Sequence, residues 1–176
     1  MQEQTANLRI LLTQDEIAAR VRELGQTIAA DYADTTPLCV CMLKGAVLFY
    51  TDLIRAIPMR LDMDFMRVSS YQNRTNTAGQ VQFLLYPSMP LTGRHVILVE
   101  DIVDTGTTMS SVLSELEKEH PASLEICTLL DKPQRRLFQI TPKYCGFTVP
   151  DVFVVGYGLD YGEQYRNLPY VAKMLP

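Results

Sequence analysis

The sequence lacks the features that would place the protein in a membrane. None of its apolar runs approaches the roughly 20 residues needed to span a lipid bilayer. The first ten residues, MQEQTANLRI, do not show the basic and then apolar pattern of a secretory signal, so we expect a cytoplasmic location. Lysine and arginine form no cluster, and the formal net charge of -4 argues against nucleic acid as the main partner.

Cysteine and histidine are also scarce. The chain has four cysteines, no CxxC pair and only two histidines, so we expect no zinc site. Cys39 and Cys41 flank one valine in an apolar run, and on a strand they would share a face without forming a disulfide bond easily. We therefore expect reduced thiols that pack as small core residues. These thiols are Cys39, Cys41, Cys127 and Cys145.

The composition that remains is that of an ordinary globular protein. At 176 residues, with 47% hydrophobic and 20% charged residues, the chain is long enough for one buried core and short for two. Periodicity predicts helices at residues 13–32, 45–57 and 108–119, and strands at 37–43, 59–71, 81–86, 95–100, 123–130 and 151–157. Strands alternate with helices, which favours a doubly wound, mainly parallel α/β sheet with an added antiparallel hairpin. We expect one domain over residues 1–176.

Three segments carry more specific signals. Thr13 and Glu16 form the pattern of a capping box at the start of the first helix. The polar segment QNRTNTAGQ, at 72–80, predicts a mobile loop. The strand at 59–71 alternates apolar and polar residues, so we expect one buried and one wet face. The residues expected on the buried face are Met59, Leu61, Met63 and Phe65.

The stretch VILVEDIVDTGTTM, residues 96–109, places three carboxylates beside a turn rich in hydroxyl and amide groups. Ligands of an open α/β sheet bind at the carboxyl ends of its strands, and the expected strand ends at Glu100. The turn from Asp104 to Thr108 leads into a helix, whose N-terminal amides favour an anion. Because the sequence contains neither GxxxxGK[ST] nor GxGxxG, the anion that we expect is a monophosphate.

The acidic residues beside this turn need a partner other than the phosphate. Glu100 and Asp101 suit the vicinal hydroxyls of a ribose, or Mg²⁺ bound to those hydroxyls. A single ligand that carries a phosphate and a sugar diol would satisfy both groups. The residues alone leave an alternative open, in which the acids are merely solvated and Asp104 and the threonines cap the helix.

The same stretch resembles the phosphoribosyl-pyrophosphate motif of the type I phosphoribosyltransferases, in which two acidic residues follow an apolar strand and a TGTT-like loop comes next. Four further segments resemble the 6-oxopurine branch of that family, the hypoxanthine-guanine phosphoribosyltransferases. In the order of the family they are CMLKGAVLFYTDL, RVSSYQNRT, LLDKPQRR and DVFVVGYGLDYGEQYRNLPYV. The resemblance implies the type I fold, with a lid at about 70–80 and a hood built from N-terminal residues and about 150–176.

The activity implied is purine salvage, in which 5-phosphoribose passes from phosphoribosyl pyrophosphate to N9 of hypoxanthine, and also of guanine. Glu100 and Asp101 would hold the ribose 2′- and 3′-hydroxyls, partly through Mg²⁺. Asp104 would take the proton from the purine. The 5′-phosphate would lie in a cradle of Asp104, Thr105, Gly106, Thr107 and Thr108.

The resemblance also assigns the purine site. Lys132 would donate to the 6-oxo group, which disfavours adenine because its 6-amino group would face a like donor. Phe153 would stack on the purine ring, and Val154 would offer backbone groups to its edge. Asp160 would be a second Mg²⁺ ligand, and Arg166 would meet pyrophosphate. Without the motif, Phe153 and Val154 would be assigned to the core.

The remaining assignments concern pyrophosphate and the lid. In the family, the peptide that corresponds to Leu43-Lys44 is cis, and the amides of the LKG element meet pyrophosphate; here that element is Leu43, Lys44 and Gly45. Ser70 and Tyr71 would open the lid, whose closure excludes water from the reacting centre.

The family assembles as dimers or tetramers, so the resemblance implies a homodimer or homotetramer. Two alternatives for the function stay open. The first is a regulator that senses nucleotides with the same fold, and the second is a phosphoribosyltransferase that prefers xanthine or a pyrimidine. The sequence does not resolve the preference among hypoxanthine, guanine and xanthine.

Overall fold

The computed structural model describes residues 7–70 and 81–175, with the exception of the side chain of Ser70. The expected loop at 72–80 and Tyr71 therefore lie outside the described residues. The helices are α1 (Gln14–Asp31), α2 (Val47–Ala56) and α3 (Thr107–Leu116), with short 3-10 helices at Glu117–Glu119 and Pro133–Arg135. The strands are β1 (Leu8–Leu12), β2 (Leu38–Leu43), β3 (Asp62–Ser70), β4 (Val81–Leu85), β5 (His95–Val103), β6 (Ser123–Asp131), β7 (Tyr144–Thr148), β8 (Val154–Val155) and β9 (Val171–Met174).

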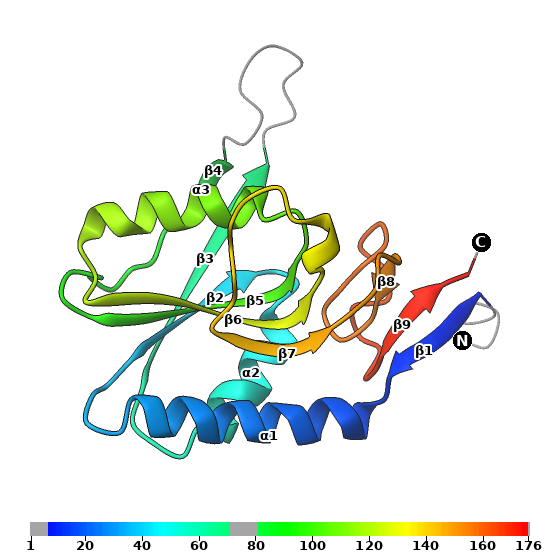
Figure 1. The fold of residues 1–176 in the computed structure, drawn as a ribbon, viewed down its shortest axis with the longest axis horizontal. Helices are drawn as coiled ribbons and strands as arrows, with labels where there is room; N and C mark the ends of the chain where they lie inside the picture. The colour runs from blue at the N-terminus through cyan, green and yellow to red at the C-terminus, as the bar shows by residue number, and fades with distance from the viewer. Residues whose placement is uncertain (1–6, 71–80, 176) are drawn as a thin grey trace, which may run out of the picture.

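A six-stranded sheet with the order β4-β3-β2-β5-β6-β7 forms the centre of the molecule (Figure 1). All neighbouring pairs from β3 to β7 are parallel, and β4 joins β3 as an antiparallel edge strand. The chain moves outward from β2 to β3 and then returns to the other side of β2 with β5. The strand order thus reverses between β2 and β5, which is where an open sheet of this kind binds ligands. The predicted α/β class, with its antiparallel hairpin, is confirmed.

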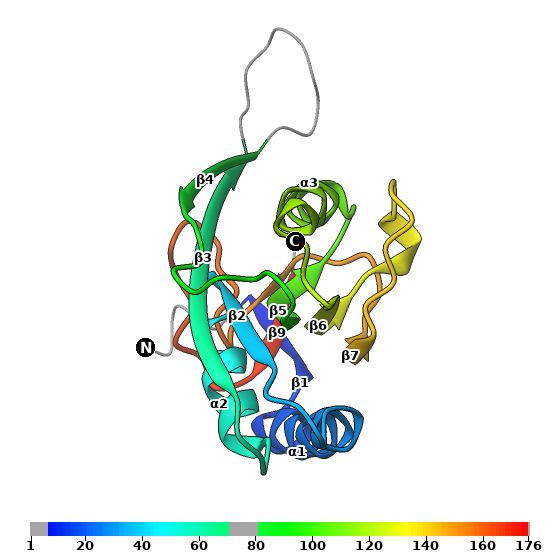
Figure 2. The same cartoon turned by 90° about the vertical axis from the view of Figure 1, so that its left-hand side faces the viewer.

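Helices cover both faces of this sheet, with α3 on one side and α1 and α2 on the other (Figures 1 and 2). Strand β2 is apolar throughout because its alternate residues serve two cores. Cys39 and Cys41 pack toward α1 and α2, whereas Leu38, Val40 and Met42 pack toward α3. The prediction that the two cysteines share a face is confirmed.

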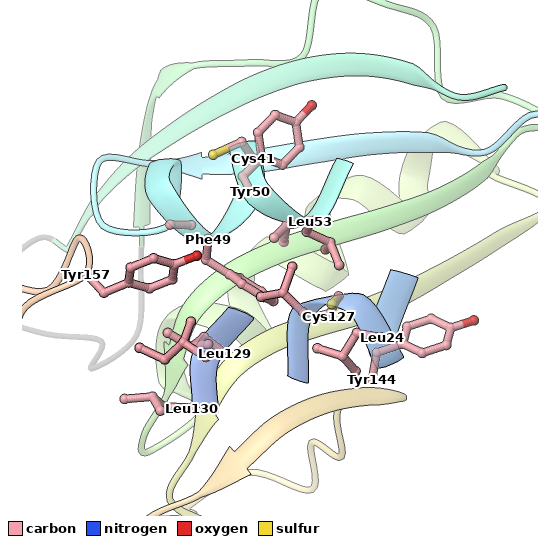
Figure 3. Packing of buried hydrophobic residues seen from close by; sticks show 14 of the residues in the cluster. Leu24, Cys41, Phe49, Tyr50, Leu53, Cys127, Leu129, Leu130, Tyr144 and Tyr157 are labelled. Carbon is pink, nitrogen blue, oxygen red and sulfur yellow. The ribbon is translucent and has the colours of Figure 1, made fainter. Parts of the chain in front are cut away.

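The larger core lies between the sheet and the helices α1 and α2 (Figure 3). Leu24 of α1 and Phe49 and Leu53 of α2 are buried there against Cys127 and Leu129 of β6. Each fully buried side chain of this size contributes about 1.5–3 kcal/mol through the hydrophobic effect. The capping box that starts α1 is present as predicted, with Thr13 and Glu16 bonded to each other in both directions.

A second sheet, with the order β1-β9-β8, joins the two ends of the described chain. Strand β1 pairs with β9, and β9 pairs with β8, both in antiparallel fashion. Figure 1 shows this small sheet beside the carboxyl ends of the central strands. Among the described residues, no helix has the length and apolar character needed to cross a membrane.

One strand prediction near the C-terminus was wrong, and the strands β1, β7 and β9 were not predicted. The segment 151–157 was expected as one strand, but only Val154–Val155 is extended and it belongs to the small sheet. Strand β7 was missed because its short sequence, YCGFT, contains a glycine and follows a proline. Gly146 is required there, since an added Cβ atom would lie 2.4 Å from the carbonyl oxygen of Leu129 on the neighbouring strand.

The face predicted for β3 is confirmed in part, because Met59, Leu61 and Phe65 pack against the larger core and Met63 does not. Met63 is 47% exposed, while Asp64 and Met66 are buried. Asp64 can be buried because its carboxylate accepts hydrogen bonds from the amides of Phe65 (2.8 Å) and Met89 (2.7 Å). The expected wet face is therefore not solvated, since Met66 and Val68 on that face pack into the second core.

Candidate active site

The candidate site lies where β5 separates from β2. Strand β2 pairs with β5 only as far as Cys41 opposite Val99, whereas β6 follows β5 to Val103. The strand that was expected to end at Glu100 therefore continues to Val103. Its last four residues border β6 on one side and open toward the turn after β2 on the other.

Glu100 and Asp101 form a coupled acidic pair in this opening. Burial raises the pKa of the Glu100 carboxyl well above its usual range, and the adjacent Asp101 carboxyl adds to the shift. Burial also raises the pKa of Asp101, although the hydrogen bond from the Ile102 amide (2.7 Å) opposes that shift. Oxygen Oε2 of Glu100 is buried without a hydrogen-bond partner among the described residues. The pair is therefore not a solvated strand end, and it attracts a cation or hydroxyl donors.

The turn after β5 encloses a cavity of about 130 Å³, which suits a single phosphate group. It is lined by Glu100, Ile102, Val103, Asp104, Thr105, Gly106, Thr107, Thr108 and Met109. Gly106 has φ +82° and is the N-cap of α3, so no N-cap side chain satisfies the first amides of that helix. Thr105 caps the helix in part, because its Oγ1 atom accepts a hydrogen bond from the amide of Thr107 at 3.3 Å, whereas the carboxylate of Asp104 bonds to Arg135 instead. The amide end of α3 remains available to an anion.

Asp104 lies between this cavity and a second one. Its Oδ2 atom is 3.0 Å from a guanidinium nitrogen of Arg135, which also lies 3.6 Å from Asp151. Its Oδ1 atom is buried and has no partner within the described part of the chain. A carboxylate with one oxygen anchored and the other unpartnered is placed to accept a proton.

The second cavity is a cleft of about 490 Å³ with room for a purine base. Its lining includes Asp101, Ile102, Asp104, Lys132, Arg135, Asp151, Val152, Phe153, Val154, Leu159 and Asp160. Lys132 is only 5% exposed, and its ammonium group donates to the carbonyl of Val152 at 2.7 Å. A buried ammonium with one carbonyl partner has donors to spare for a ligand.

The two residues expected to contact a ring differ in burial. Val154 is buried, as its core assignment would require, but Phe153 is 55% exposed at the cleft. The ring of Phe153 meets the ring of Tyr161 edge to face, with the centroids 5.6 Å apart. Because one face of Phe153 is open, its assignment to the core is wrong and a stacking role is available to it.

Arg166 and Asp160 lie together rather than apart. A guanidinium nitrogen of Arg166 is 2.9 Å from Asp160, and the other donates to the carbonyl of Gly158 at 2.7 Å. Arg166 also approaches Glu163 at 3.4 Å, and the ammonium of Lys44 lies 3.0 Å from the same carboxylate. Arg166, which was expected at pyrophosphate, thus shares one acidic partner with the side chain of Lys44, whose backbone amide was expected there.

The turn after β2 touches the acidic pair. The Leu43-Lys44 peptide is cis. A Cβ atom on Gly45 would lie 1.6 Å from Oδ2 of Asp101, and one on Gly158 would lie 1.9 Å from the carbonyl oxygen of Gly45. Three segments far apart in the sequence therefore meet where only glycine fits.

Comparison with known proteins decides the family. Residues 8–162 match the family model described as "Phosphoribosyl transferase domain". The chain is 45% identical to the hypoxanthine-guanine phosphoribosyltransferase of Bacillus subtilis over 168 residues, which is 96% of this chain and 93% of that protein. This chain belongs to the hypoxanthine-guanine phosphoribosyltransferase family.

Other members of this family agree in sequence and in structure. The hypoxanthine-guanine phosphoribosyltransferase of Staphylococcus epidermidis is 47% identical over 165 residues, covering 94% of this chain and 92% of that protein. The crystal structure of a hypoxanthine phosphoribosyltransferase from Staphylococcus aureus superimposes with a TM-score of 0.94 at 44% identity, covering 99% of this chain and 95% of that one. The resemblance noted in the sequence is thereby confirmed.

The family implies Mg²⁺, and the acidic pair fits it. Carboxylate oxygens are ligands that Mg²⁺ prefers, and the orphaned Oε2 atom of Glu100 lacks the partner that a cation or a metal-bound water would supply. Within residues 7–70 and 81–175, no three His, Cys, Asp or Glu side chains gather as a metal cluster. The pair would therefore hold the ion together with substrate oxygens and water. Asp160 faces the same cleft as Asp101 but is paired with Arg166.

Several residues of this site were missed in the sequence. They are Arg135, Arg136, Asp151, Tyr161 and Glu163. Each lies outside the α-helices and strands, in a loop, a turn or a short 3-10 helix, where no periodic pattern indicates which way a side chain points. The pair Arg135-Arg136, at the end of the segment LLDKPQRR, was the one visible signal, because adjacent cations beside an anion site are available to contact it.

Proposed function

We propose that this chain is a purine salvage enzyme that transfers 5-phosphoribose from phosphoribosyl pyrophosphate to N9 of hypoxanthine and of guanine. The products would be inosine or guanosine monophosphate and pyrophosphate. One observation carries the proposal: a phosphate-sized cavity, a half-buried acidic pair and a cleft with a buried lysine adjoin one another along the end of β5.

The donor would lie across the end of β5. The amides at the start of α3 and the hydroxyls of Thr105, Thr107 and Thr108 would hold its 5′-phosphate. Glu100 and Asp101 would accept hydrogen bonds from the ribose hydroxyls. Lys44 and Arg166 would neutralise the pyrophosphate, whose departure leaves positive charge on the ribose ring.

Mg²⁺, when bound between the acidic pair and the donor, would neutralise charge on the leaving pyrophosphate and fix the orientation of the ribose. The remaining contacts would come from backbone groups and side chains of this chain. Leu43 and Gly45 would present backbone groups toward pyrophosphate, and Ser70 and Tyr71 would open a lid that excludes water.

The base would occupy the 490 Å³ cleft. Lys132 would donate to its 6-oxo group while keeping its bond to Val152, and Phe153 would stack on the ring. Asp104 would accept the proton that the purine loses when N9 bonds to the ribose. A general base in such a position contributes about 10²–10⁴-fold to the rate.

Assembly and location are proposed with the same function. We propose a single catalytic domain over residues 1–176, with the small sheet as its hood and residues 70–80 as its lid. A homodimer or homotetramer and a cytoplasmic location stay predictions.

The test is a direct assay with Mg²⁺, phosphoribosyl pyrophosphate and one base at a time. We expect nucleotide and pyrophosphate in equal amounts with hypoxanthine and with guanine, and much less with adenine. Tight nucleotide binding without turnover would favour the sensing regulator instead. A kcat/KM value highest for xanthine or uracil would replace the proposed base.

Replacement of the buried lysine tests the base assignment separately. Lys132→Gln should lower kcat/KM for hypoxanthine by about 10–100-fold, because the 6-oxo group would lose a charged donor. The KM for the phosphoribosyl donor should change little. An unchanged preference for hypoxanthine over adenine would contradict the role of Lys132.

A further inference from the structure

Arg136 lies behind the phosphate-sized cavity and is not among its lining residues. It follows the 3-10 helix Pro133–Arg135, and its side chain is only 12% exposed. One guanidinium nitrogen forms an ion pair with Asp131, whose side chain is 13% exposed. The other nitrogen donates to the backbone carbonyl of Asp104 at 2.5 Å. The arginine thus connects the end of β6 with the turn that follows β5.

This bond is one of three that hold consecutive carbonyls of the turn. The amide of Lys132 donates to the carbonyl of Val103 at 3.0 Å, and the amide of Leu137 donates to the carbonyl of Thr105 at 2.9 Å. Together with the bond from Arg136 to Asp104, they draw the carbonyls of residues 103–105 toward the segment after β6.

The direction of these carbonyls sets the direction of the amides. In a trans peptide the C=O and the following N–H point in opposite directions. When the carbonyls of residues 103–105 turn toward the segment after β6, the amides of residues 104–106 turn to the other side. The same turn lines the phosphate-sized cavity, where amide donors would attract an anion and carbonyl oxygens would repel it.

Of the three bonds, only the one to Asp104 comes from a side chain. This arrangement depends on a guanidinium group, because two separate nitrogens bond to Asp131 and Asp104 at the same time. The ammonium group of a lysine has a single nitrogen. The stem of Arg136 also fills the space beside Gly106, where an added Cβ atom would lie 3.1 Å from its Cδ atom.

We propose that Arg136 is a positioning residue for the substrate phosphate, holding the Asp104 carbonyl away from the cavity so that the amides of the turn face the anion. Asp131 anchors the guanidinium in that orientation. The inference rests on the proposed function, since it takes the anion to be the 5′-phosphate of the nucleotide.

The experiment compares the binding of inosine monophosphate and inosine by calorimetry, because the two ligands differ only in the phosphate. Arg136→Lys keeps a cation near Asp131 and loses the bond to the Asp104 carbonyl. We expect this substitution to lower the affinity for inosine monophosphate about tenfold, as loss of a charged hydrogen bond does. The affinity for inosine should change by less than about twofold. The KM for phosphoribosyl pyrophosphate should rise more than kcat falls.

Arg94→Lys is the matched control. Arg94 pairs with Asp62 at 2.5 Å near the opposite end of β5, so the same substitution there should leave the ratio of the two affinities unchanged. If Arg136→Lys does not fold, Asp131→Asn gives the same measurement. It retains the arginine, removes its anchor, and should lower the ratio by a smaller factor.

The outcomes separate this inference from the proposed function. If the unmodified protein binds both ligands equally, the phosphate assignment fails and the proposed function fails with it. If the unmodified protein prefers the nucleotide and the variant retains that preference, Arg136 does not position the phosphate. An equal loss of affinity for both ligands would mean that Arg136 has only a structural role, and it would also overturn the proposal.

Discussion

The ammonium group of Lys44 lies 3.0 Å from the carboxylate of Glu163, across 119 positions of the sequence. The same carboxylate approaches Arg166 at 3.4 Å. The hydrogen bond from Lys44, followed by that from Arg166, lowers the pKa of Glu163, so the group stays ionised at neutral pH. Glu163 therefore forms ion pairs with both of the cations that we assign to pyrophosphate.

We expect Glu163→Gln to lower the KM for phosphoribosyl pyrophosphate by about threefold, because the donor would no longer displace a competing carboxylate. The effect should be modest, since the side chains of Lys44 and Glu163 are 49% and 65% exposed and solvent weakens such pairs. Steady-state kinetics with varied donor measures it. Glu23→Gln, which breaks the similarly exposed pair with Arg20, should leave this KM unchanged. A raised KM would show instead that Glu163 helps to hold the donor.

Asp104→Asn should slow the chemical step by about 10²–10⁴-fold while the protein folds normally. The amide keeps the shape of the side chain but no longer accepts the proton. Single-turnover kinetics with hypoxanthine measures the step, and thermal unfolding checks the fold.

Asp151→Asn serves as the comparison for Asp104→Asn, because Asp151 is the other carboxylate beside Arg135. It should slow the reaction far less, since only Asp104 has a buried and unpartnered oxygen. Equal rate losses in the two variants would mean that the charge near Arg135 matters and that Asp104 is not the base.

The central sheet could be predicted from the sequence because its signals are local. Apolar runs such as LCVCML mark strands that are buried on both faces, and the capping box of Thr13 and Glu16 marks the start of α1. The acidic pair and the turn after it were also visible, since they are contiguous in the sequence. Their position within β5 could not be predicted, because β5 continues past Glu100 for as long as β6 pairs with it.

Other features depend on contacts that no local pattern records. Strand β7 exists because Gly146 allows close approach to Leu129, and Asp64 can be buried on β3 because the amide of Met89 donates to its carboxylate. The bond from Arg136 to the Asp104 carbonyl joins positions 32 residues apart in irregular segments. Such contacts follow from the tertiary arrangement and not from periodicity or propensity.

Asp31 should make stability depend on pH in the acid range. Its hydrogen bond from Tyr144 (2.7 Å) and then its bond with Lys143 lower its pKa in the folded protein. A carboxyl whose pKa is lowered by folding contributes stability above its unfolded pKa of about 3.9, and that contribution is lost as the pH falls through the folded value. Asp31→Asn should therefore be less stable than the unmodified protein at pH 7, and the difference should shrink below pH 4. Urea unfolding at several pH values measures it, and a constant difference would contradict the assignment.

Gly45→Ala should disturb the acidic pair while leaving most of the fold intact. The added Cβ atom would lie 1.6 Å from Oδ2 of Asp101, and that oxygen is the end of a side chain that can rotate away. We expect the Mg²⁺ concentration for half-maximal activity to rise by about tenfold or more, the usual cost of displacing a metal-site side chain. Gly93→Ala is the matched control, because Gly93 has open space around it but φ +70°. That control should lower the melting temperature through about 1 kcal/mol of backbone strain and leave the Mg²⁺ requirement unchanged. If the two variants respond to Mg²⁺ alike, the contact between Gly45 and Asp101 does not position the carboxylate.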